Sequence, residues 1–208
     1  MSRSGDWFLR TNPNDDVYDS PVDDGYEGYV RGARKKAEKH VMNWFNQIKD
    51  ETMASLSPHV KLQDVDNLVY DDTRFHNAIW HASTEILPHL EVQVVIDGKN
   101  NCYVTTGSAG YVEFGLTPPV GMVLPIRCWI HTHPFGAAYF SGTDIRTVSN
   151  WQTYMQEAYV LGSADDRGHY GYWSRDNPRQ LEIYDDKEYV RIQTWGERGN
   201  VILSGEEE

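Results

Sequence analysis

The chain has 208 residues, of which 39% are hydrophobic and 12% are aromatic, so a chain that is disordered throughout is excluded. Its formal net charge is -12. An acidic surface repels phosphate backbones, which argues against nucleic acid as a partner. We therefore interpret the acidity as a solubility feature.

Residues 1–28 are rich in Asp, Asn, Pro and Gly, which favour turns and break regular structure. They predict a flexible acidic arm, and they contain no apolar core typical of a signal peptide. The range Val30–Leu56 has helical periodicity, and residues 29–70 are predicted to form an N-terminal helical extension. We expect any larger assembly to form through residues 1–56.

Residues 71–204 are predicted to form the main domain, and 205–208 a frayed tail. Asp71-Asp72-Thr73 marks the start of a helix over Arg74–His89, which Pro88 ends. A second helix is expected over Thr143–Met155, capped by Ser141 or Thr143. The expected strands are Leu90–Gly98, Asn101–Thr106, Gly110–Phe114, Met122–Ile130, Glu157–Ser163, Tyr170–Ser174, Leu181–Tyr184, Tyr189–Gln193 and Asn200–Leu203.

This order of elements predicts an α+β fold with a mixed central β-sheet flanked by helices. No run of eighteen apolar residues is present, so no membrane span is expected. Cys102 and Cys128 lack the spacing of a redox or metal motif and are expected to be free thiols. We expect a soluble protein, cytoplasmic or carried in a larger particle.

The segment from His131 to Asp144 carries the clearest chemical signal. His131 and His133 are two residues apart at the end of an extended run, so both side chains lie on one side. Pro134 then turns the chain, and Asp144 enters at the start of a helix. Two His and one carboxylate, with a fourth position left for water, are typical of a catalytic zinc site.

Such a site needs two further groups. A zinc ion lowers the pKa of its water toward about 7, and a Glu within reach accepts the proton and delivers it to the leaving nitrogen. The hydroxyl of Ser141 is placed by sequence to stabilise the oxyanion. The residues therefore indicate hydrolysis of an amide bond.

The pattern His-Thr-His-Pro, six residues, Ser, two residues, Asp resembles the signature of the JAMM (MPN+, Mov34/JAB) metalloprotease family. The resemblance covers about residues 72–162 and implies a cytidine-deaminase-like architecture. It also implies zinc bound by His131, His133 and Asp144, with Ser141 stabilising the intermediate and an upstream Glu as acid/base. Substrates in the family imply an extended ubiquitin-like or sulfur-carrier tail, or a cell-wall peptide for members found in phage tails.

The Glu has three candidates. Glu91 is preferred, because Leu90–Gly98 resembles the family's Glu-containing strand after a helix, although Val94 stands where Gly is usual. Glu85, in the preceding helix, and Glu113, in a short expected strand, are the alternatives.

Two other functions compete with hydrolysis. The same fold serves as an assembly module with little or no catalysis, for example in a virion or phage tail. A branch that acts on nucleic acid carries His-Asn-His-Pro, whereas Thr132 stands here.

Two neighbouring features have open interpretations. The apolar loop Phe135–Phe140 either lines a substrate groove or seals against the sheet, and Trp129 packs in the core or beneath the metal. The six remaining histidines show no ligand spacing with the motif and are expected to be ordinary surface or partly buried residues: His40, His59, His76, His81, His89 and His169.

Overall fold

The computed structural model describes residues 24–61, 65, 69–87, 89–107, 121–163, 170–178, 180–184, 189–195 and 201–203. Within this part of the chain, the strands form one sheet in the order β2-β1-β3-β4-β5-β6-β7-β8. β3 and β4 are parallel, and the other neighbouring strands are antiparallel. The predicted α+β class with a mixed sheet flanked by helices is therefore confirmed.

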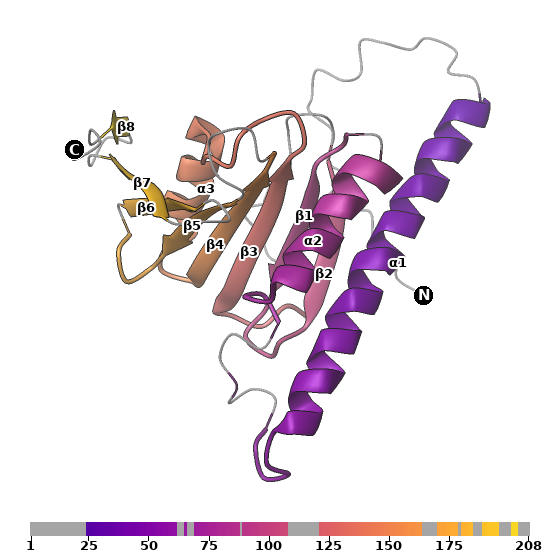
Figure 1. Cartoon of the computed structure of the whole chain (residues 1–208), viewed down its shortest axis with the longest axis horizontal. Coiled ribbons are helices and arrows are strands. Elements are labelled where there is room, and N and C mark those ends of the chain that lie inside the picture. Colours follow the sequence, from indigo (N-terminus) through magenta and orange to yellow (C-terminus); the bar gives the residue numbers. More distant parts are fainter. Residues whose placement is uncertain are drawn as a thin grey trace.

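Two helices and a π-helical turn cover one face of the sheet (Figure 1). They are α1 (Asp24–Ser55), α2 (Thr73–His81) and η3 (Ala82–Ile86). Val41, Phe45 and Ile48 recur along one side of α1 and are at most 2% exposed. Burying a side chain of this size contributes about 1.5–3 kcal/mol, so this stripe attaches α1 to the sheet.

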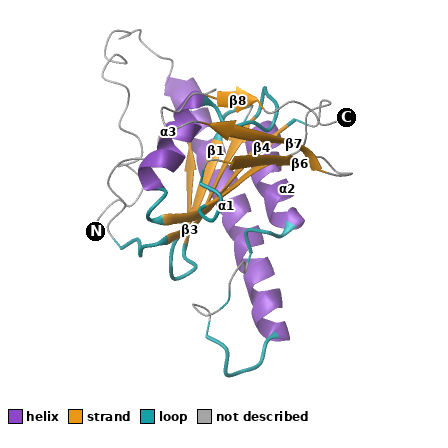
Figure 2. Ribbon diagram, turned by 90° about the vertical axis from the view of Figure 1, so that its left-hand side faces the viewer, coloured by secondary structure: helices purple, strands orange, loops and turns teal. Residues whose placement is uncertain are grey.

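The third helix, α3 (Gly142–Trp151), lies on the opposite face of the sheet and connects β3 to β4 (Figure 2). Ile145 and Val148 of this helix pack with Trp129 and Val160 of the sheet. A helix between two parallel neighbouring strands is the usual crossover. The strands are β1 (Val92–Ile96), β2 (Cys102–Thr106), β3 (Ile126–His133), β4 (Met155–Gly162), β5 (Tyr170–Ser174), β6 (Gln180–Tyr184), β7 (Tyr189–Trp195) and β8 (Val201–Leu203).

Several boundaries differ from the prediction. α1 begins at Asp24, so residues 24–28, assigned above to the arm, belong to the helix. α3 ends at Trp151 rather than Met155, because Met155 begins β4. β3 begins four residues later than expected and continues through both motif histidines. The predicted strand Gly110–Phe114 and residues 1–23 lie outside the described residues.

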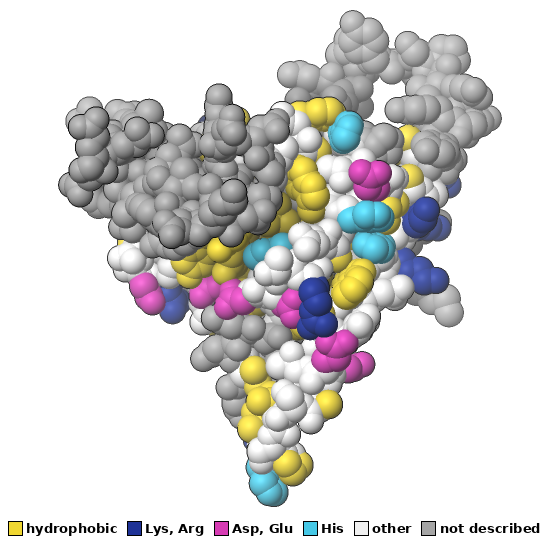
Figure 3. All heavy atoms as spheres, viewed as in Figure 1, with side chains coloured by type: hydrophobic (Ala, Val, Ile, Leu, Met, Phe, Trp, Pro, Cys, Tyr) yellow, Lys and Arg dark blue, Asp and Glu magenta, His cyan; other side chains and the backbone are white. Residues whose placement is uncertain are grey.

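The expectation that both cysteines are free thiols is met. Cys102 and Cys128 are free thiols, and burial raises the pKa of each. The basic residues of α1 are largely exposed, and Lys and Arg side chains are visible on the surface in Figure 3. Among the described residues, no helix is both long and apolar enough to cross a membrane.

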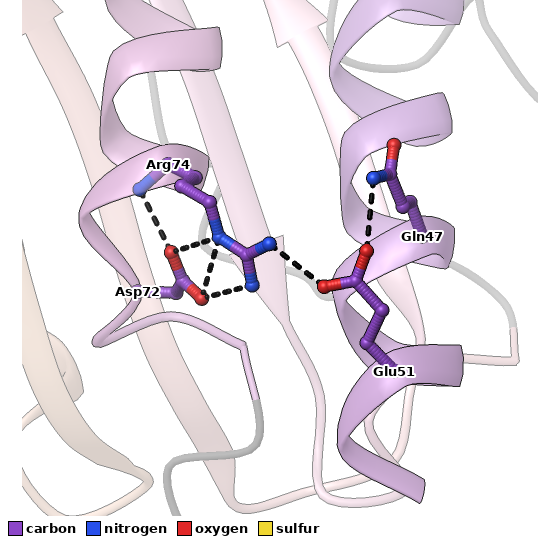
Figure 4. Close-up of polar contacts among 4 residues, drawn as sticks. All are labelled: Gln47, Glu51, Asp72 and Arg74. Carbon is purple, nitrogen blue, oxygen red and sulfur yellow. Dashed lines mark hydrogen bonds and ion pairs between the residues drawn. The ribbon is translucent and has the colours of Figure 1, made fainter. Parts of the chain in front are cut away.

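A polar network joins the start of α2 to α1 (Figure 4). Asp72 is the N-cap of α2 and accepts a hydrogen bond from the backbone N–H of Arg74 at 2.8 Å. The Arg74 side chain donates to Asp72 and, at 2.7 Å, to Glu51 of α1. Glu51 also accepts a hydrogen bond from Gln47. Asp72 therefore both caps one helix and orients the cation that reaches the other.

Replacing Asp72 with Ala is expected to destabilise the fold by about 1 kcal/mol at pH 7, because the cap is lost. The hydrogen bonds from Arg74 lower the pKa of Asp72 below its ordinary value of 3.8. The stabilisation of the folded state by the Asp72 charge is therefore fully present above pH 3.8. It is lost as the pH falls through the lower pKa that Asp72 has in the folded protein. Urea unfolding of the two proteins at pH 7 measures the difference. Asp50→Ala, at an exposed position of α1, is the control and should unfold like the parent.

Candidate metal centre

The two motif histidines occupy the carboxyl end of β3. His131 is 1% exposed and His133 is half-buried. Side chains in a strand alternate between faces, so both imidazoles lie on the α3 face together with Trp129. The ring of Trp129 stacks on that of His131, with centroids 4.4 Å apart and an interplanar angle of 14°. Trp129 is thus a core residue that also supports a motif histidine, which combines the two interpretations given above.

Asp144 comes from the first turn of α3. Ser141 is the N-cap of this helix, and the two residues form a capping box. The Ser141 backbone N–H donates to Oδ2 of Asp144 at 2.6 Å, and the Ser141 hydroxyl accepts from the Asp144 backbone N–H at 3.3 Å. The expected cap is confirmed, and the capping geometry fixes the direction in which the carboxylate points.

The three side chains meet at one point. Nε2 of His131 lies 3.2 Å from Oδ1 of Asp144, and Nε2 of His133 lies 3.5 Å from Oδ2. One atom from each of the three residues lies within 4.8 Å of the others. Two atoms bound at about 2.0–2.1 Å to a tetrahedral zinc ion are separated by roughly 3.3 Å. The two short separations, each to a different oxygen of Asp144, are close to this value, and the three residues together can hold a metal ion.

The charge states also fit a metal. Burial lowers the pKa of His131, and the nearby Asp144 acts in the opposite direction. For Asp144, burial alone would raise the pKa, but His131, His133 and Ser141 together hold it well below its usual range. Metal binding requires neutral imidazole and an ionised carboxylate. Nε2 of His131 is also buried and, among the described residues, has no hydrogen-bond partner of suitable geometry.

Glu91 lies directly before β1, beside this group. It is 5% exposed, and burial raises its pKa to about 7. The charge of His133 opposes this rise and that of Asp144 adds to it, so Glu91 lies within electrostatic range of both residues. A carboxyl group that titrates near neutrality can accept a proton and return it. Of the two candidate glutamates that the structure describes, Glu91 is the one that lies near the predicted ligands.

Of the other two candidates, the structure describes only Glu85. Glu85 is exposed on η3, in the helical layer on the other face of the sheet. Glu113 lies outside the described residues. Of the other histidines, His76 is half-buried and donates from Nε2 to the carbonyl oxygen of Tyr70, while His59 is exposed. His169 also lies outside the described residues.

Gln93, which the motif did not predict, lies opposite His131 in the pairing of β1 with β3. Gln93 is fully buried, and its Oε1 accepts a hydrogen bond at 3.0 Å from Nε1 of Trp129. It therefore fixes the indole that stacks on His131. In the sequence, the only indication of this role is that Gln93 interrupts an apolar run. Which residue Gln93 contacts depends on the register in which β1 pairs with β3.

The motif also did not predict a pair of buried hydroxyls on the other face of β3. Oγ1 of Thr132 accepts a hydrogen bond from the Val92 backbone N–H at 2.9 Å and lies 2.9 Å from Oγ of Ser83. The Ser83 hydroxyl donates to the Leu90 carbonyl oxygen at 2.6 Å. Because Ser83 uses its proton there, Thr132 donates to Ser83. This hydroxyl pair therefore holds the backbone on both sides of Glu91.

The loop Phe135–Phe140 seals partly against the sheet, and two of its aromatic side chains stay exposed. Ala138 and Phe140 are at most 2% exposed and seal the loop against the sheet. Gly162 permits this contact, since a Cβ there would lie 2.2 Å from the backbone nitrogen of Ala138. Phe135 and Tyr139 are 70% and 44% exposed, and the Tyr139 ring contacts His133 edge-on. Two aromatic side chains therefore remain at the surface beside the histidines.

Comparison with family models, with curated proteins and with solved structures gives no match for this chain. The site is thus defined by its geometry alone. His131, His133 and Asp144 can hold a metal ion, and the buried Glu91 lies near them.

Proposed function

We propose that this protein is a zinc-dependent hydrolase of the JAMM/MPN+ type that cleaves a peptide or isopeptide amide bond. The observation that carries the proposal is the meeting of His131, His133 and Asp144 at one point beside the buried carboxyl of Glu91. The resemblance in sequence also supports it, because His131, His133 and Asp144 match the family signature and Glu91 stands in a segment similar to the family's Glu-containing strand.

Zinc is the metal that we propose. Two imidazoles and one carboxylate form a three-ligand set that leaves a position open, as in catalytic zinc sites. The same donors also bind non-haem iron(II), so the identity of the metal is a separate part of the test. When bound, zinc activates water and polarises a carbonyl group.

The protein side chains supply the proton transfers and the polar contacts. Glu91 accepts a proton from the attacking water and delivers it to the leaving nitrogen, for which its raised pKa is suited. The Ser141 hydroxyl uses a lone pair to cap α3, and its proton is left to donate to the oxygen of the scissile carbonyl. The capping box therefore positions both the carboxylate of Asp144, a proposed metal ligand, and the hydroxyl of Ser141, a proposed hydrogen-bond donor.

We propose a protein or peptide substrate with an extended segment at the cleavage point. The exposed rings of Phe135 and Tyr139 offer apolar contacts beside the site. A ubiquitin-like tail, a sulfur-carrier tail and a cell-wall peptide are the substrate classes to compare. The first two place the enzyme in the cytoplasm, and the third suits a virion-associated protein.

Metal analysis combined with an activity assay tests the proposal. We expect about one zinc ion per chain in the purified protein and hydrolysis of at least one of the three substrate classes, which a chelator abolishes. Asp144→Asn should lose most of the zinc and all detectable hydrolysis. His59→Ala, at an exposed histidine outside the group, is the matched control and should keep both.

Other results would change the assignment. Stoichiometric iron in place of zinc would contradict the choice of metal. Zinc bound without hydrolysis of any substrate in the panel would contradict the hydrolase and favour an assembly module on the same fold.

A further inference from the structure

Two aromatic side chains beside the metal centre are largely exposed. Phe135 is 70% exposed, and Tyr139 is 44% exposed. The ring of Tyr139 contacts that of His133, with centroids 5.3 Å apart. The ring of Phe135 contacts that of His89 edge-on, with centroids 4.9 Å apart. Since His89 lies two residues before Glu91, Phe135 lies beside the segment that leads into the proposed acid/base residue.

The backbone that carries these two rings is held in place by hydrogen bonds. The Gly136 N–H donates to the His133 carbonyl oxygen at 3.0 Å, and the Gly136 carbonyl oxygen accepts from the Ser163 N–H at 2.9 Å. The loop is therefore tied both to the end of β3 and to the residue after β4. A ligand that covers Phe135 and Tyr139 thus has little backbone freedom to remove, which favours binding.

The residue that contacts Phe135 has an unusual backbone conformation. His89 has a φ of 60°, in the left-handed region that residues with a side chain rarely adopt. It lies in a turn that the Leu90 N–H closes by donating to the Leu87 carbonyl oxygen at 3.1 Å. The Leu90 carbonyl oxygen in turn accepts from the Ser83 hydroxyl at 2.6 Å. Unfavourable conformations of this kind cluster at functional sites, and this one presents a ring to an exposed Phe beside the metal centre.

The chemistry of this surface favours one kind of ligand. The loop Phe135–Phe140 contains no charged residue. Aromatic rings gain most from a partner that removes apolar area from water, and a second ring or a branched aliphatic chain does this best. A large apolar side chain is therefore the complementary ligand, whereas a small side chain gains little and a charged one loses hydration.

The proposed chemistry gives the surface its place along a substrate. Glu91 delivers its proton to the leaving nitrogen, so that nitrogen lies next to Glu91 when a substrate is bound. The contact of Phe135 with His89 lies beside the same segment. The exposed ring of Phe135 is therefore on the side of the scissile bond from which the amine departs.

We propose that Phe135, with His89 and Tyr139 beside it, forms a subsite for a large apolar side chain on the substrate residue that leaves with the amine. The inference rests on the proposed function and narrows its substrate class. A side chain next to the leaving nitrogen belongs to an α-amino group, because the side-chain nitrogen of lysine is joined only to methylene groups. The subsite therefore favours a peptide bond followed by an aromatic or large aliphatic residue over an isopeptide bond.

Binding of two tripeptides tests the subsite without any turnover. Phe-Gly-Gly stands for the fragment that leaves with the amine, and Gly-Gly-Gly is the same fragment without the side chain. In a nuclear magnetic resonance titration of the whole chain, we expect Phe-Gly-Gly to bind about tenfold or more tightly than Gly-Gly-Gly, because only the first buries a ring. Equal affinities, or no binding of either tripeptide, would overturn the proposal.

Variants locate the ring that binds. Phe135→Ala should reduce the difference between the two tripeptides to about threefold or less, whereas Phe135→Leu keeps an apolar side chain and should retain most of it. Tyr154→Ala is the matched control, since Tyr154 is 52% exposed and precedes β4 at the end of the sheet away from the histidines. Circular dichroism verifies that each variant is folded. An unchanged preference in Phe135→Ala would show that the side chain binds elsewhere and would refute the assignment.

Digestion of a mixed peptide library separates this inference from the proposed function. Mass spectrometry of the products identifies each cleaved bond, and we expect Phe, Tyr and Leu to be enriched directly after it, with the enrichment lost in Phe135→Ala. Cleavage without this enrichment would refute the subsite and leave the hydrolase in place. Binding of Phe-Gly-Gly without any cleavage would leave the apolar binding surface in place and contradict the hydrolase.

Discussion

Replacing Glu91 with Gln is expected to abolish hydrolysis while the metal stays bound. The change removes the group that accepts and delivers the proton but alters none of the three ligands. General acid–base groups contribute on the order of 100- to 10,000-fold to rate, so we expect a fall of that size in kcat. Zinc content measured on the same preparation should remain at about one per chain.

The variant should also fold as well as its parent. The carboxyl group of Glu91 is buried, and its charged form is disfavoured there, as its raised pKa shows. Gln has nearly the same shape and avoids the cost of burying a charge. The loss of rate is thus expected without a loss of thermal stability.

Glu85→Gln is the matched control, because Glu85 is exposed on η3, and it should retain full activity. If Glu91→Gln were as active as the parent, the role would pass to Glu113. A variant that lost zinc together with activity would instead identify Glu91 as a ligand.

The parts of the site that follow from local geometry could be predicted from the sequence. The spacing of His131 and His133 suffices to place both rings on one face, because strand side chains alternate with a period of two. The position of Asp144 three residues after Ser141 is the spacing of a capping box, which fixes the start of α3 and the direction of the carboxylate. These relations span no more than fourteen residues.

Relations that depend on sheet register could not be predicted. Gln93 acts on Trp129 because β1 pairs with β3 in one register, and a shift by one residue would turn it to the other face. Ser83 and Thr132 are 49 residues apart and meet through the packing of η3 against the sheet. A cavity lined by His76 of α2, Tyr159 of β4 and Tyr172 of β5 likewise depends on how these elements pack together.

The start of β3 illustrates the same limit. The apolar run Met122–Ile130 predicted a strand that starts at Met122, yet Val123 instead donates its backbone N–H to the buried carboxylate of Asp97. Asp97 also accepts from the backbone of Lys99 and Asn101, so one side chain organises the turn after β1. A tertiary contact therefore holds Val123 outside the strand, whereas composition alone would have started β3 at Met122.

The hydroxyl pair of Ser83 and Thr132 gives the second prediction of large effect. From the Val92 N–H, hydrogen bonds run through Thr132 and Ser83 to the Leu90 carbonyl, so the pair holds both neighbours of Glu91. Thr132→Val keeps the shape but leaves the buried Val92 N–H without an acceptor. We expect a loss of about 1–3 kcal/mol in the free energy of unfolding, measured by urea titration.

The same change should lower kcat, since displacement of a catalytic group by about 1 Å costs up to roughly 100-fold. We expect a fall of about 10- to 100-fold in kcat at a temperature where the variant is fully folded, with zinc still bound and KM little changed. Thr132→Ser restores the hydroxyl and should recover most of the rate, which a loss of packing alone would not allow. Thr84→Val, which removes a hydrogen bond within the helical segment to the Trp80 carbonyl, is the matched control. Equal kcat in Thr132→Val and its parent would mean that Glu91 is positioned without the hydroxyl pair.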